Sequence, residues 1–81
     1  MNENLIDYIA EKSSLYVSDL LLPKNSAVII RVVSLINPDD FSTADWSASL
    51  SYLLGRHLRF ATVEAAKDYY IKNLLNNLSN S

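Results

Sequence analysis

Polar residues recur at steps of three and four along the first part of the chain, which is the period of an exposed helical stripe. They are Asn4, Asp7, Glu11, Ser14 and Ser18. The opposite stripe is apolar, and Pro23 disfavours helical geometry at the residue before it. This pattern predicts one helix over residues 3–21, with a kink at Ser13-Ser14 if the helix is not straight. A break at these serines, which would divide the segment into two short helices, is the alternative.

The next stretch, residues 26–36, is rich in β-branched residues, which favour strands by propensity. A β-hairpin over residues 16–35 followed by two helices, an α+β arrangement, is therefore an alternative. The polar positions favour a helix, because Arg31 and Ser34 share a helical stripe but would face opposite sides of a strand. We expect a helix over residues 25–36, and a central position for it because its polar stripe is narrow.

Two later helices carry local start and stop signals. Ser42 opens a capping box with the acid three residues later, and Gly55 stands where a helix end favours a left-handed residue. These signals predict a helix over residues 43–54. Thr62 is a suitable cap for a last helix, predicted over residues 62–78.

Together the four predicted helices form an all-α fold, a small four-helix bundle in a single domain that spans residues 1–81. Phe41 and Trp46 stand at the two positions of a hydrophobic staple, which fixes how the chain enters the third helix. The third and fourth helices are expected to pack around large side chains that they share: Trp46, Leu50, Leu54, Tyr70 and Leu74.

The composition suits one small domain that depends on apolar burial. Hydrophobic residues make up 49% of the 81 residues, and the absence of cysteine excludes disulfides and thiolate metal sites. One histidine cannot form a zinc site by itself, so we expect no metal and no cofactor. A chain of this length lies near the lower limit for a single core, which makes self-association a further way to bury apolar surface.

The net charge of −2 argues against a general nucleic-acid binder, because such domains usually present a basic field. The N-terminus is acidic where a secretory signal would be basic. The longest apolar stretch, residues 27–36, is too short to cross a bilayer. We therefore expect a cytoplasmic protein without a membrane span.

The densest positive charge of the chain lies in Arg56, His57 and Arg59. This cluster could receive an anion or an acidic partner, and it supports an alternative function as a nucleic-acid-binding accessory protein. Positive charge after a helix C-terminus also complements the helix dipole, which is the simpler explanation. No carboxylate or nucleophile stands at a telling spacing from His57, so we assign no catalytic residue and expect no enzyme.

Some apolar residues remain after each core stripe is filled, and these are the predicted partner-binding residues: Tyr8, Leu15, Leu22, Tyr52 and Tyr69. Tyrosine is enriched at binding hot spots, although such residues equally complete the rim of a small core. We expect a non-enzymatic protein that binds a protein partner or its own copy. A small regulator, inhibitor, immunity-type or accessory protein of a bacterium or phage fits this expectation.

Overall fold

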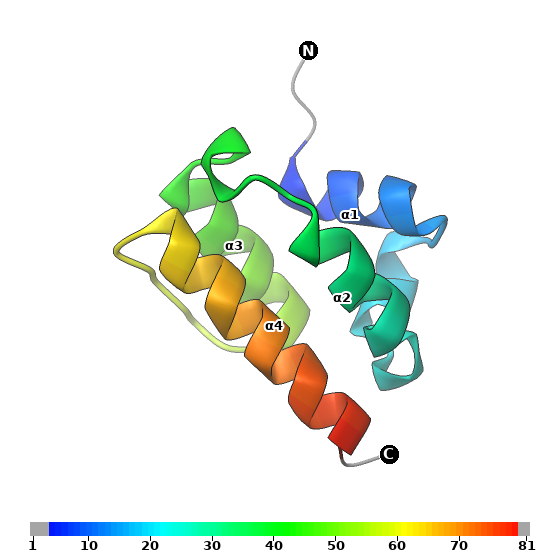
Figure 1. Ribbon diagram of the computed structural model, residues 1–81. Helices are drawn as coiled ribbons and strands as arrows, with labels where there is room; N and C mark the ends of the chain where they lie inside the picture. The colour runs from blue at the N-terminus through cyan, green and yellow to red at the C-terminus, as the bar shows by residue number, and fades with distance from the viewer. Residues whose placement is uncertain (1–3, 80–81) are drawn as a thin grey trace.

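A computed structural model describes residues 4–79 and contains four α-helices within that range (Figure 1). They are α1 (Leu5–Ser13), α2 (Ser26–Ser34), α3 (Thr43–Leu54) and α4 (Val63–Ser79). Short 3-10 turns lie at Val17–Leu21, Pro23–Asn25 and Pro38–Asp40. No β-strand occurs in residues 4–79, so the all-α prediction is confirmed and the hairpin over residues 16–35 is wrong.

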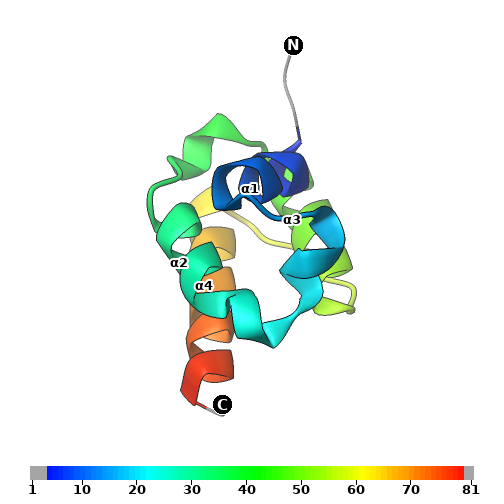
Figure 2. The same cartoon turned by 90° about the vertical axis from the view of Figure 1, so that its right-hand side faces the viewer.

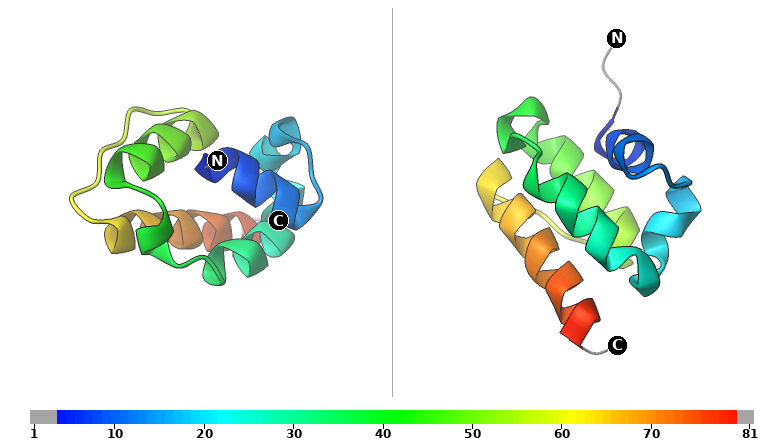
Figure 3. Two further views of the ribbon diagram at one scale, coloured as in Figure 1. Left: turned by 90° about the horizontal axis from the view of Figure 1, so that it is seen from above. Right: turned by 45° about the vertical axis from the view of Figure 1, so that its right-hand side comes forward.

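The helices pack in a ring in which α1 contacts α2, α2 contacts α4, α4 contacts α3 and α3 contacts α1. α2, α3 and α4 run roughly alongside one another, whereas α1 lies across them (Figures 2 and 3). In this ring the contact between α2 and α4 is the most extensive, and α2 also packs against α1 and the turn before it. α2 buries Ile29 and Val33 against the core and leaves Arg31 at the surface, and Leu35, the residue after its end, is also exposed.

The predicted helix over residues 3–21 is wrong in its second half, and residue 3 lies outside the described range. α1 ends at Ser13, and Ser14 takes a left-handed conformation (φ 59°) in which its N–H donates to carbonyls of the last helical turn. The Ser13 hydroxyl donates to the Ile9 carbonyl, a local bond that weakens serine as a helix former. The predicted kink at these two serines is therefore a complete break.

Both ends of α3 are as predicted. The Ser42 hydroxyl accepts a hydrogen bond from the Asp45 N–H at 3.0 Å, and Gly55 takes φ 67° after the last turn. The rings of Phe41 and Trp46 meet edge to face with centroids 6.5 Å apart, which confirms the hydrophobic staple. Local sequence signals alone therefore defined this helix.

A capping box predicts that the Asp45 carboxylate accepts from the N–H of Ser42. Its hydrogen bonds go instead to Leu5 and Ser49. One of its oxygens accepts from the Leu5 N–H, at the first residue of α1, over 3.2 Å. The other accepts from the Ser49 hydroxyl over 3.1 Å. One side chain therefore joins the beginning of α1 to the first turn of α3, and it satisfies a backbone donor that has no partner inside its own helix.

α4 begins after Thr62, whose hydroxyl accepts from the Ala65 N–H at 3.1 Å, and it ends one residue beyond the predicted 62–78. Four of the five predicted core residues are buried: Trp46, Leu50, Tyr70 and Leu74. The fifth, Leu54, is half-buried, and Leu53 is the buried residue of that turn. The core therefore includes the contact of α3 with α4, as expected, and it extends to buried residues of α1 and α2: Leu5, Ile9, Ile29 and Val33.

Candidate functional site

Three of the predicted partner-binding residues are half-buried, and the first two of them pack against the core. They are Tyr8, Leu15 and Tyr69. The Tyr8 ring meets Phe41 edge to face at 5.5 Å, and the Tyr69 ring meets Phe60 in the same way at 5.4 Å. Each of these tyrosines therefore packs against one aromatic neighbour and remains partly exposed.

The other two predicted residues, Leu22 and Tyr52, are exposed by 40% and 55%. The most exposed large apolar side chains of the described residues were not predicted: Leu35 at 84% and Tyr16 at 81%. One signal could have found Leu35, because it follows Arg31 by four residues and so continues the exposed stripe of α2.

Leu35 lies at the edge of a groove of about 210 Å³ between α1 and α2. The other lining residues are Tyr8, Lys12 and Val32, so the groove is apolar with one cation. The Lys12 ammonium lies 5.6 Å from the centre of the Tyr8 ring, within the range of a cation–π contact. The Leu35 N–H donates to the Val32 carbonyl at 3.1 Å, which fixes the backbone that carries the exposed side chain.

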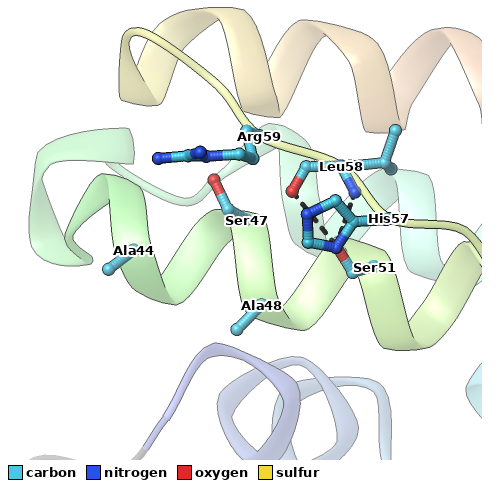
Figure 4. Close-up of a pocket in the computed structure, with 7 residues that line it drawn as sticks. All are labelled: Ala44, Ser47, Ala48, Ser51, His57, Leu58 and Arg59. Carbon is cyan, nitrogen blue, oxygen red and sulfur yellow. Dashed lines mark hydrogen bonds between the residues drawn. The ribbon is translucent and has the colours of Figure 1, made fainter.

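A second and larger hollow, of about 370 Å³, lies on the outer face of α3 (Figure 4). α3 contributes only small residues to it: Ala44, Ser47, Ala48 and Ser51. His57, Leu58 and Arg59 complete the lining from the segment that follows α3 and runs beside it. The hollow and the groove share no lining residue.

Two serines hold the segment after α3 against the helix. The Ser51 hydroxyl accepts from the Leu58 N–H at 2.9 Å and donates to the Leu58 carbonyl at 3.1 Å. The Ser47 hydroxyl accepts from the Phe60 N–H at 3.2 Å. The lining of the hollow is therefore fixed by backbone hydrogen bonds at two points.

The predicted cluster of Arg56, His57 and Arg59 is divided between two faces. The Arg56 guanidinium donates to the Tyr69 hydroxyl of α4 at 3.3 Å. His57 and Arg59 line the hollow, and within residues 4–79 neither side chain makes a hydrogen bond or an ion pair. The cationic side chain at the hollow is therefore that of Arg59, with His57 beside it.

The Lys67 ammonium is a further cation with an internal role. It donates to the carbonyls of Ser34 and Ile36, at 3.2 and 2.8 Å, beyond the last turn of α2. These are carbonyls that a helix end leaves without partners, and positive charge there also complements the dipole. Lys67 therefore connects α4 to the end of α2 instead of facing a ligand.

Within residues 4–79, no group of three histidine or acidic side chains is placed to hold a metal ion. In the same range no helix is long and apolar enough to cross a membrane. Comparison of the chain with protein families, with curated proteins and with solved structures finds no match. The groove between α1 and α2 and the hollow on α3 are therefore the two candidate binding surfaces.

Proposed function

We propose that the protein acts by binding another protein through the groove between α1 and α2. The observation that carries this proposal is the 84% exposure of Leu35 at the edge of an apolar groove. Isolated exposed leucines are ordinary on protein surfaces. Leu35, in contrast, has Tyr8 and Val32 as neighbours across a concave surface, which is the setting of a binding hot spot.

The energetics favour a partner with an apolar anchor residue. Covering a leucine side chain stabilises a complex by roughly 1.5–3 kcal/mol, before the entropy of association is subtracted. The fixed backbone of Leu35 lowers the entropic cost, because the residue is held before the partner arrives. Lys12 at the edge favours a partner that places an acidic side chain beside its apolar anchor.

A regulator, inhibitor or accessory protein works in this way, by occupying a surface of its target without chemistry. The partner is another protein or a second copy of this chain, and the experiment below separates the two. The nucleic-acid alternative has less support, because its basic cluster is divided: Arg56 donates to the Tyr69 hydroxyl, whereas His57 and Arg59 line the hollow.

The test compares the wild type with Leu35→Asp and with Tyr16→Asp, a matched control of nearly equal exposure. Each protein is immobilised and exposed to lysate, and each is also examined by analytical ultracentrifugation. We expect a partner, or a dimer, that the wild type and Tyr16→Asp retain and Leu35→Asp loses. Equal retention by all three proteins, or monomers that retain nothing, would contradict the proposal.

A further inference from the structure

The hollow on α3 offers a floor that a second helix can approach closely. Ala44 and Ala48 are exposed and stand one helical turn apart, and Ser47 and Ser51 are half-buried beside them. The distance between packed helices depends on the side chains at their contact, and these are among the smallest. Such a floor leaves room for a helix laid in the hollow, which is one of the established ways in which a protein surface receives a peptide.

The wall of the hollow supplies a positive charge. A guanidinium presents several N–H donors in a plane and matches a carboxylate in a two-point contact. The Arg59 guanidinium makes no such contact within residues 4–79. No acidic residue lines the hollow, and the one acid in the first turn of α3, Asp45, is bound to Leu5 and Ser49.

The same contacts disfavour a phosphate in the hollow. Phosphate sites usually combine cations with free backbone N–H groups. Here the N–H groups of Leu58 and Phe60 already donate to the serines of α3. Arg59 and His57 therefore act without backbone donors from these two residues, an arrangement better matched to a carboxylate.

We infer that the hollow on α3 docks an acidic helical segment of a partner protein, with a carboxylate of that segment bound by Arg59. Small residues of the segment, or its backbone, lie on the floor between Ala44 and Ala48. Tyr52 stands one turn beyond Ala48 on α3 and, at 55% exposure, contacts the segment at the end of the hollow. This site is independent of the groove proposed above, so the protein has two binding surfaces.

The probes are two synthetic alanine-rich helical peptides, one with glutamate at every fourth position and a twin with glutamine there. Each is titrated into the ¹⁵N-labelled full chain while amide chemical shifts are followed. The glutamate peptide is expected to shift the amides of Ala48, Leu58 and Arg59 and to leave those of Val32 and Leu35 unchanged. The glutamine twin should bind at least about tenfold more weakly, because it lacks the charge-assisted contact.

Two matched variants locate the charge. Arg59→Gln should weaken binding of the glutamate peptide by about tenfold. Arg56→Gln, three residues away and bonded to Tyr69, should leave the affinity within about twofold, because exposed charge outside a contact has little effect. Ala48→Leu adds bulk to the floor and should weaken binding of both peptides.

The inference is overturned by equal affinity for the two peptides, by an equal loss in Arg56→Gln, or by shifts confined to the groove. It is also overturned if duplex DNA or inorganic phosphate displaces the glutamate peptide and shifts the same amides. Leu35→Asp is expected to bind the glutamate peptide as the wild type does. Failure of the hollow can therefore be distinguished from failure of the groove.

Discussion

The pair α3 and α4 and the segment between α1 and α2 are held in place by different forces. The pair is joined by large side chains that are fully buried, of which Trp46 and Tyr70 are the largest. The segment over residues 14–25 contributes only Leu20 to the buried core. Its turns are held by hydrogen bonds in which the Asp19 carboxylate accepts from the Tyr16 N–H and the Asn25 amide donates to the Asp19 carbonyl.

This difference shows which part of a fold a hydrophobic pattern can describe. Apolar burial is not directional, and its effect grows with area, so it leaves a periodic trace in the sequence. A hydrogen bond from one side chain to one backbone group depends on geometry and leaves no such trace. We therefore expect substitutions of the buried apolar side chains to have global effects on stability. Substitutions that remove a single hydrogen bond, as in the segment over residues 14–25 or at the beginning of α1, should have local ones.

The largest expected effect is in the packed pair. Trp46→Ala should lower the free energy of unfolding by roughly 3–5 kcal/mol, because it removes a large buried aromatic side chain and leaves a cavity in the core. The substitution also removes the indole N–H bond to the Pro38 carbonyl (3.0 Å) and the contact with Phe41. Urea unfolding measures this loss. Tyr52→Ala, an exposed control on the same helix, should change stability by about 0.5 kcal/mol or less.

A smaller effect is expected where a polar side chain holds α1. Asp45→Ala should cost about 2 kcal/mol, because it leaves the Leu5 N–H without its acceptor. Hydrogen exchange should show faster opening of α1 with little change in α4. Asp45→Asn keeps an acceptor oxygen and should cost less, whereas uniform acceleration in both helices would contradict a local role.

The smallest expected effect concerns a buried polar group in α4 that has no hydrogen-bond partner within residues 4–79. This group is the Tyr70 hydroxyl. Because an unsatisfied buried hydroxyl is unfavourable, Tyr70→Phe should raise the free energy of unfolding by about 1 kcal/mol at neutral pH. Chemical denaturation of both proteins measures the gain, and a clear loss would mean that the hydroxyl has a partner in solution.

The same residue predicts a dependence on alkaline pH. Burial raises the pKa of the Tyr70 hydroxyl well above its ordinary value near 10. Above pH 10 the unfolded chain loses this proton while the folded protein keeps it, so stability falls as pH rises, by about 1.4 kcal/mol per unit. The stability difference between Tyr70→Phe and the wild type should therefore widen above pH 10.

The sequence defined the elements that have signals of their own. The bounds of α3 follow from Ser42 and Gly55, and Arg31 with Ser34 distinguished helix from strand in α2. The sequence indicated the right serines, but the interruption there is larger than expected. It depends on the left-handed backbone conformation of one residue, Ser14, which a pattern of polar and apolar positions does not reveal.

The surfaces were harder to predict because they depend on how the elements pack. Arg56 and Arg59 are close in sequence but lie at different parts of the surface. The reason is that the chain after Gly55 turns back along α3, where hydrogen bonds to Ser47 and Ser51 hold it. Only that return forms the hollow. Leu35 was assigned to the helix predicted over residues 25–36, but α2 ends at Ser34, and the exposed Leu35 lies just after that end.

The bond between the Leu5 N–H and the Asp45 carboxylate also bears on the order of events during synthesis. Its two ends lie 40 residues apart. At roughly 5–20 residues per second, a ribosome makes Asp45 about 2–8 s after Leu5. α1 has nine residues, fewer than the ~12–15 at which an isolated helix becomes marginal. Translation therefore produces α1 several seconds before the Asp45 carboxylate that accepts from its first N–H.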